Sequence, residues 1–349
     1  MRMICSAVLA LAAMLPVRAD KVDDFMRDAM AHHPIAGAAL EVLQNGQVVK
    51  RSAYGLANLE WQIPATPETV FEIGSITKQF TAAGILLLAQ DGKLSVDDKI
   101  SQYLKDTPSS WQDITLRHLL THTSGIVNYT GLDGFELRRH LTQAQFIKEV
   151  GAHALVFPPG AKWAYCNTGF NLLGYIIENV SGQRYWDFMR ARIFSPLGMT
   201  NTTDRDPRPL LAFRAHGYDT NAAGQFINRD DDLTDIFSAG AIVSTVDDMA
   251  RWSASLDSHQ LLTPSTEAQM WTPLTLASGK TKDYGFGWFL DPWHGHQNIG
   301  HSGTTDGFSA SFQRFPQDKL VIILLTSSDE SGVATKVAKD LALLYLEPR

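Results

Sequence analysis

The chain has 349 residues, of which 44% are hydrophobic and 19% are charged, and its formal net charge is -7 at neutral pH. This ordinary globular composition excludes a disordered or collagen-like chain, and the acidic balance gives no indication of nucleic acid as a partner. The length is sufficient for one large domain or two.

The N-terminus reads as a targeting segment. Arg2 precedes a short apolar run from Met3 to Leu15, and Val17-Arg18-Ala19 resembles a small-residue cleavage site. The run is shorter than the roughly 20 residues that span a bilayer. We therefore predict that residues 1–19 are a signal peptide that is removed, which places the protein in the periplasm or outside the cell with no stable membrane span. An uncleaved anchor is the alternative.

Cysteine usage follows from this prediction. Cys5 lies in the leader, so the mature chain keeps Cys166 alone and forms no internal disulfide. We expect Cys166 to be a small buried apolar residue rather than a nucleophile.

The first predicted elements are a helix and a hairpin. Apolar residues at helical spacing predict an amphipathic helix over Asp20–His33. Strands follow over Ala38–Leu43 and Gln47–Tyr54, and Asn45-Gly46 between them is typical of a type I′ turn. Ile76–Gln90 is apolar on most of its circumference, which predicts a helix buried on several sides.

The remaining segments divide into a helical middle and a second group of strands. Helices are predicted over Leu116–Thr121, Thr142–Val150, Thr168–Val180 and Tyr185–Ile193; strands over Ala241–Ser244, Gly285–Leu290, Ser309–Phe315 and Leu320–Thr326; and a closing helix over Val333–Tyr345. We therefore predict an α/β (α+β) fold: one antiparallel sheet built from both ends of the chain and flanked by the N- and C-terminal helices. Residues 20–74 and 240–349 would form this α/β subdomain, and residues 75–239 an inserted, mainly helical subdomain.

Ser75 and Lys78 lie three residues apart at the start of the buried helix. Side chains at this spacing share one face of a helix. The positive end of the helix dipole disfavours a cation there, so the amine is pushed toward its neutral, basic form. A serine beside such a base is an activated nucleophile, although Ser-x-x-Lys also occurs by chance with Ser as a helix cap.

Two further motifs lie downstream. Tyr165 and Asn167 precede the Thr168 helix; Asn167 would be a simple N-cap, or Tyr165 would place a phenol near Ser75 for proton exchange. Beside a Lys cation that phenol would shift toward phenolate. His301 and Gly303 fall just before the edge of a late strand, where glycine allows close backbone approach and exposed amides hold a substrate or an oxyanion.

Together these motifs, in this order, resemble the serine β-lactamase and penicillin-binding-protein superfamily, and most closely its class C β-lactamase, DD-peptidase, D-aminopeptidase and esterase branch. The resemblance covers residues 30–330. Other stretches that carry it are residues 118–126, Pro159-Gly160, Pro196-Leu197-Gly198-Met199 and Gly300 to Gly303.

The resemblance implies an acyl-serine hydrolase without a metal or cofactor, acting on a small molecule or a peptide. Ser75 would attack the carbonyl, and Lys78 and Tyr165 would share the proton transfers. Asn167 would hydrogen-bond the substrate amide or Lys78. The backbone N–H groups of Ser75 and Thr304 would form the oxyanion hole.

His301 stands where many β-lactamases carry lysine. Histidine is largely neutral at pH 7, so it supplies no permanent charge for a substrate carboxylate. This favours a D-amino-acid peptidase, DD-carboxypeptidase or esterase-like enzyme over an efficient β-lactamase. A true class C-type β-lactamase and an inactive binding protein on the same fold are the alternatives. Asp306 either pairs with a substrate amine at the pocket rim or is a turn residue.

Other chemistries fit less well. His118 and His122 have helical spacing for two metal ligands, but Leu119 stands where a zinc protease has glutamate. The Gly-x-Ser-x-Gly elbow of an α/β-hydrolase does not surround Ser75. Trp288, Trp293 and Phe308 would line a pocket or, by default, pack the sheet.

Overall fold

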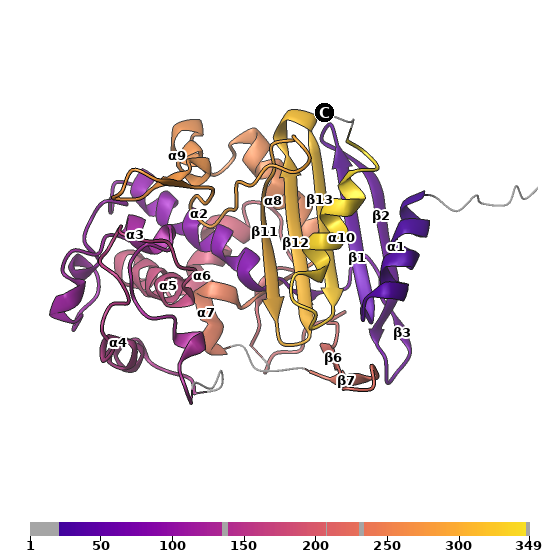
Figure 1. Cartoon of the computed structure of the whole chain (residues 1–349), viewed down its shortest axis with the longest axis horizontal. Helices are drawn as coiled ribbons and strands as arrows, with labels where there is room; N and C mark the ends of the chain where they lie inside the picture. The colour runs from indigo at the N-terminus through magenta and orange to yellow at the C-terminus, as the bar shows by residue number, and fades with distance from the viewer. Residues whose placement is uncertain (1–20, 135–138, 207, 230–233, 347–349) are drawn as a thin grey trace, which may run out of the picture.

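The computed structural model describes residues 21–134, 139–206, 208–229 and 234–346, so the predicted leader and Cys5 lie outside the described residues. A six-stranded antiparallel sheet lies to the right in Figure 1, and helices gather to the left. The order of its strands is β11 (Ile299–Thr305), β12 (Phe308–Phe315), β13 (Leu320–Ser327), β1 (Gly37–Gln44), β2 (Gln47–Asn58) and β3 (Ile63–Pro64). This confirms the predicted fold class.

The first strand pairs with the last. Gly37 of β1 faces Ser327 of β13, and the register continues to Gln44 opposite Leu320. The turn between β1 and β2 has positive φ angles at Asn45 (52°) and Gly46 (75°), as the predicted type I′ turn requires. The sheet is therefore built from both ends of the chain.

Alternation along the strands separates two hydrophobic cores. Leu40, Val42 and Ile322 point to one face, where they pack with α1 (Lys21–His32) and α10 (Val333–Ala342). Ala39 and Ile323 point to the other face and join a larger core that includes α8 (Val246–Ser258) and the helical region. Because successive side chains of a strand face opposite ways, each buried strand serves both layers.

The helical region surrounds α2 (Thr77–Gln90), which follows a short 3₁₀ turn, η1 (Gly74–Ile76). Every residue of α2 from Thr77 to Leu88 is buried, which confirms the predicted burial on several sides. The surrounding helices are α3 (Leu116–Leu120), α4 (Gln143–Gly151), α5 (Asn167–Ser181), α6 (Tyr185–Met189), α7 (Phe237–Gly240) and α9 (Pro264–Ala268). Just before α2, η1 packs against strand β11 (Figure 1).

Three predictions about elements were wrong or incomplete. Helix α8 was missed, although Thr245 caps it and its apolar residues recur at helical spacing. Gly285–Leu290 is not a strand, since only single bridges form there, between Tyr284 and Phe289 and between Phe289 and Gly300. Residues His301 to Gly303 lie inside β11, although they were predicted to precede a strand. This strand was missed because glycine lowers the strand propensity of its sequence.

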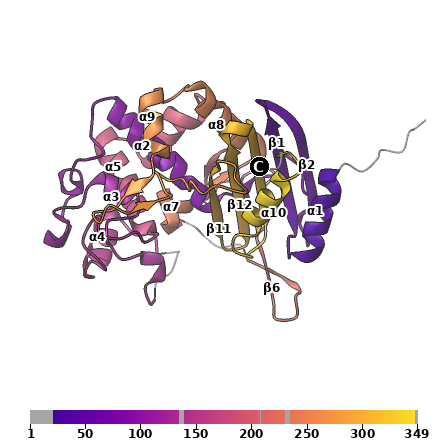
Figure 2. The same cartoon turned by 45° about the horizontal axis from the view of Figure 1, so that its top comes forward.

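Short strands complete the fold. β4 (Phe71–Glu72) and β5 (Thr203–Asp204) both pair with β8 (Ile242–Ser244). Of these strands, β4 lies just before η1 in the sequence. A hairpin of β6 (Tyr218–Thr220) and β7 (Phe226–Asn228) projects from the body at the bottom of Figure 2. β9 (Leu274–Thr275) pairs with β10 (Thr281–Lys282). Within the described ranges, no helix combines the length and the apolar character needed to cross a membrane.

Candidate active site

Ser75 lies where two chain segments meet at their backbones. A β-carbon on Gly303 would stand 1.9 Å from the carbonyl oxygen of Ile73, and one on Gly74 would stand 2.8 Å from the Thr304 nitrogen. Gly74 also has a positive φ of 50°. Only glycine allows an approach this close, so these two glycines bring the Ser75 turn against the Thr304 end of β11.

Lys78 contacts the Ser75 side chain directly. Its Nζ lies 2.9 Å from Ser75 Oγ and 2.7 Å from the carbonyl oxygen of Ala239, on α7. The side chain is fully buried, and burial holds the pKa of Lys78 well below its usual value. A hydroxyl and a carbonyl do not stabilise an ammonium as a carboxylate would. Burial, rather than the helix dipole, is thus the main cause that favours the uncharged amine predicted from the sequence.

The Tyr165 ring lies 4.8 Å from Lys78 Nζ, measured to its centroid. Burial raises the pKa of the Tyr165 phenol above its usual value, and the nearby Ser75 hydroxyl opposes this effect more weakly. The predicted shift toward phenolate was therefore wrong, since Lys78 carries no charge to stabilise it. Within the described chain, the buried Tyr165 hydroxyl makes no hydrogen bond of normal geometry.

Cys166 is the N-cap residue of α5 and Asn167 is its first residue, so Asn167 is not the N-cap that the sequence suggested. The Asn167 side chain donates from Nδ2 to Thr130 Oγ1 at 3.2 Å, and its backbone N–H donates to Asn128 Oδ1 at 2.9 Å. Lys78 instead bonds Ser75 and Ala239, so the expected Asn167–Lys78 bond is not formed. The Cys166 thiol is free and buried, as expected, and burial raises its pKa.

His301 is turned into the protein interior. Its ring nitrogens lie 2.6 Å from the Ser302 carbonyl oxygen (Nδ1) and 3.2 Å from the Tyr284 hydroxyl (Nε2). Burial lowers the pKa of His301 to about 3. The ring is therefore neutral at pH 7, and both of its nitrogens already have protein partners. Tyr284 was not predicted from the sequence to belong to this site.

The other residues singled out in the sequence have structural partners. Asp306 pairs with Arg229, with Nη2 and Oδ1 3.3 Å apart, so its charge is already partly balanced. His118 completes a capping box with Thr115 at the start of α3. Trp288 and Phe308 are buried in the core, and Trp293 donates from Nε1 to the Lys339 carbonyl at 3.0 Å. These aromatic residues pack the sheet.

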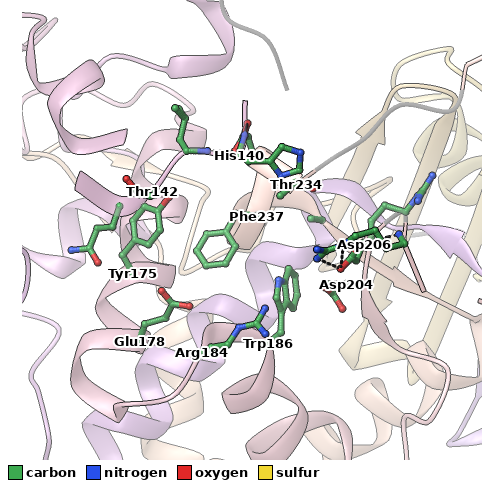
Figure 3. A pocket seen from close by; sticks show the side chains of 16 residues that line it. His140, Thr142, Tyr175, Glu178, Arg184, Trp186, Asp204, Asp206, Thr234 and Phe237 are labelled. Carbon is green, nitrogen blue, oxygen red and sulfur yellow. Dashed lines mark hydrogen bonds and ion pairs between the residues drawn. The ribbon is translucent and has the colours of Figure 1, made fainter. Parts of the chain in front are cut away.

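A separate cavity of about 650 Å³ lies among α5, α6, α7 and β5 (Figure 3). Tyr175, Trp186 and Phe237 form its aromatic wall, and Glu178 and Arg184 lie beside them. None of the described residues that line it belongs to the three motifs. The cavity is therefore distinct from the Ser75 site, although α7, which carries the Ala239 carbonyl, lies between them.

Comparisons with known proteins agree with this geometry. The Beta-lactamase family model matches residues 22–347. Penicillin-binding protein 4* of Bacillus subtilis (strain 168) is 30% identical over 317 residues, covering 85% of this chain and 69% of that protein. D-amino acid amidase from Ochrobactrum anthropi SV3, complexed with L-phenylalanine amide, superposes with a TM-score of 0.82 at 26% identity, over 93% of this chain and 96% of that one.

A third relative is the D-stereospecific amidohydrolase from Streptomyces sp., with a TM-score of 0.76 at 26% identity, over 90% of this chain and 96% of that one. These matches each cover at least 85% of this chain, and the family model includes all three motifs. The chain therefore belongs to the beta-lactamase family, within the superfamily of serine β-lactamases and penicillin-binding proteins.

Proposed function

We propose that this protein is an exported serine hydrolase that forms an acyl-enzyme on Ser75 and cleaves an amide, peptide or ester bond. The observation that carries the proposal is the 2.9 Å contact between Ser75 Oγ and an uncharged Lys78 amine. A free lone pair at hydrogen-bond distance is what a general base requires. The family's serine hydrolases, among them the amidases above, support the same reaction class.

The proton transfers balance with these side chains alone. As Ser75 Oγ bonds to the substrate carbonyl carbon, its proton passes to Lys78 Nζ. The N–H groups of Ser75 and Thr304 donate to the developing oxyanion. Tyr165 gives its phenolic proton to the leaving amine or alkoxide and takes one from the Lys78 ammonium. Water then attacks the acyl carbon, and the same groups return the protons to their starting positions.

The substrate class follows from His301. Since its ring is neutral and its nitrogens are occupied, it offers no cation for a substrate carboxylate. This favours amides or esters of amino acids over substrates recognised through a free carboxylate. The similarity to D-amino acid amidase and to the D-stereospecific amidohydrolase supports a D-amino acid amide in the acyl position.

Active-site labelling tests the proposal. We expect a fluorophosphonate to label the wild-type protein and not the Ser75→Ala variant. Hydrolysis of D-phenylalanine amide should exceed that of the L-amide. Strong labelling by a fluorescent penicillin, with rapid release, would favour the β-lactamase alternative. Equal fluorophosphonate labelling of the alanine variant, or none of either protein, would refute an acyl-enzyme on Ser75.

Export is a separate part of the proposal and has its own test. The apolar run ahead of Val17-Arg18-Ala19 supports a cleaved leader. Intact mass of the protein recovered from the periplasm or the medium should correspond to a chain that begins at Asp20. A species that retains Met1 would refute cleavage.

A further inference from the structure

A buried chain of hydrogen bonds joins the two motif segments on either side of Ser75. It begins at the Cys166 N–H, which donates to His122 Nδ1 at 3.1 Å. His122 Nε2 lies 3.0 Å from the Tyr284 hydroxyl. That hydroxyl lies 3.2 Å from His301 Nε2, and His301 Nδ1 lies 2.6 Å from the Ser302 carbonyl. We call this set of groups, from Cys166 N–H to Ser302 C=O, the Tyr284 relay.

The two backbone ends determine every proton in the relay. A backbone N–H only donates, so His122 Nδ1 must accept, and a neutral His122 then carries its proton on Nε2. The Tyr284 oxygen accepts that proton, so its own O–H must donate to His301 Nε2. His301 therefore carries its proton on Nδ1 and donates it to the Ser302 carbonyl, which only accepts.

Both histidines are held neutral by their surroundings. His122, Tyr284 and His301 are each no more than 2% exposed. Burial is the main cause of the lowered pKa of each histidine. The Tyr165 ring also faces His301, at 6.2 Å between centroids. Within the described chain, no carboxylate contributes to the histidine shifts.

A proton on His301 Nε2 would disrupt the relay. The Tyr284 oxygen would then face two N–H donors, and its own O–H would lose its acceptor. A buried donor without a partner costs about 1–3 kcal/mol. The phenol of Tyr284 therefore selects one tautomer of His301 and opposes its protonation, which an apolar ring in the same place would not do.

We propose that Tyr284 is a positioning residue: through His301 Nδ1–H it orients the Ser302 carbonyl, and with it the Gly303–Thr304 backbone, relative to the Tyr165–Asn167 loop. Its catalytic consequence depends on the acyl-serine function proposed above. Ser302 immediately precedes Gly303, whose backbone meets Ile73 and Gly74, so a tilt of this peptide changes the direction of the Thr304 N–H. Misplaced donors weaken oxyanion stabilisation and slow acylation.

The relay itself is tested without any substrate. Two-dimensional ¹⁵N NMR of the imidazole rings reports which nitrogen of each histidine bears the proton, and the signals can be assigned with His122→Gln and His301→Gln variants. In the wild-type protein at pH 7 we expect Nε2–H for His122 and Nδ1–H for His301. The opposite tautomer at either residue, or a doubly protonated His301, would overturn the proposal.

Tyr284→Phe then tests what the hydroxyl does, because the ring and its packing remain. Tyr185→Phe is the matched control: that tyrosine is equally buried, and its hydroxyl bonds Thr81 at 2.7 Å, outside the relay. We expect Tyr284→Phe to give mixed His301 tautomers, and kcat/KM lower by about tenfold to a hundredfold, mostly through kcat. The activity should also fall more steeply below pH 6 than in the wild type.

A purely structural Tyr284 would behave differently. If His122 and His301 keep their wild-type tautomers in Tyr284→Phe, and the activity of this variant equals that of the Tyr185→Phe control, the positioning role is refuted. If Tyr284→Phe does not fold, the wild-type tautomers still decide whether the relay exists. Since the NMR readout needs no turnover, a failure of the proposed hydrolase activity is distinguishable from a failure of the relay.

Discussion

Two buried basic side chains lie near the same end of strand β11, and they differ in their partners. The Arg205 side chain is 5% exposed, and its Nε donates to Glu72 Oε1 at 2.8 Å. Lys78 is fully buried, and its partners are a hydroxyl and a carbonyl. Arginine keeps its charge in proteins, and a carboxylate partner offsets the cost of burying it. Lys78 has no such partner and stays neutral.

The comparison shows how similar burial serves two purposes. Glu72 also accepts a hydrogen bond from the Thr305 hydroxyl at 2.8 Å through Oε2. The Glu72–Arg205 pair therefore helps to fix the position of the Thr305 end of β11. Lys78, three residues after Ser75, has no carboxylate partner, which favours its uncharged form. The presence or absence of one carboxylate therefore separates a structural cation from the amine that we propose as the catalytic base.

Removing the amine should have the largest effect. Lys78→Met is expected to lower kcat/KM by at least about a thousandfold, since the general base is lost. The same change should raise the melting temperature, because the folded wild-type protein must bury an amine that is charged when unfolded. Steady-state kinetics and calorimetry at pH 7 test both parts. A melting temperature below that of the wild type would contradict the account of the buried neutral amine.

Removing the carboxylate from the other pair should destabilise the fold. Glu72→Gln removes the carboxylate that pairs with the buried Arg205 charge, and we expect the free energy of unfolding to fall by about 3–5 kcal/mol. Glu68→Gln is the control, because Glu68 pairs with Arg51 at the surface and should lose less than about 1 kcal/mol. Urea denaturation measures both. Equal losses would mean that burial does not strengthen the Arg205 pair.

Adding a carboxylate beside Lys78 would make the two sites more alike. The side chain of Cys166 lies close enough to Lys78 for the two groups to influence each other's pKa. Cys166→Asp should raise the pKa of Lys78 and lower kcat/KM about tenfold to a hundredfold at pH 7, relative to the isosteric Cys166→Asn. Activity of the Asp variant should recover as the pH rises. A flat ratio of the two variants across pH would refute this.

The last prediction concerns a buried acid of strand β1, on the face of the sheet that packs against α8. Burial, with the nearby Asp247 carboxylate, raises the pKa of Glu41 to about 8. Between pH 4.5 and 8, folding must therefore keep Glu41 protonated, and stability falls as the pH rises. Glu41→Gln should remove this loss, so its gain in stability over the wild type should grow toward pH 8 and be small near pH 4.5. If this account is wrong, thermal melts would show the same difference in melting temperature between Glu41→Gln and the wild type at every pH in this range.

Local patterns predicted much of this molecule. Asn45-Gly46 predicted the hairpin, alternating residues predicted the strands, and the Ser75–Lys78 spacing predicted the 2.9 Å contact. Each of these signals depends on neighbours within a few residues. The roles of Tyr165, Asn167 and Thr304 in catalysis remain predictions, although the structure places Tyr165 beside Lys78 and Thr304 beside the Ser75 turn.

What was missed depends on distant contacts. The Ala239 carbonyl reaches Lys78 from a segment far along the chain, and a backbone acceptor leaves no trace in a sequence. Tyr284 precedes a stretch that reads as a strand. Its partners come from distant segments, since His122 follows α3 and His301 lies in β11. The state of the Tyr165 phenol depended on burial, which the motif alone does not report.

The pairing of β1 with β13 affects how the chain is made. Strand β1 leaves the ribosome well before its partner from Leu320 to Ser327, because the helical region and strands β2 to β12 lie between them in the sequence. Until β13 is made, the hairpin of β1 and β2 has an open edge and uncovered apolar faces, which invite association with other chains. The sheet therefore cannot be completed before β13 emerges, and the first hairpin is the segment of the nascent chain most exposed to mispairing.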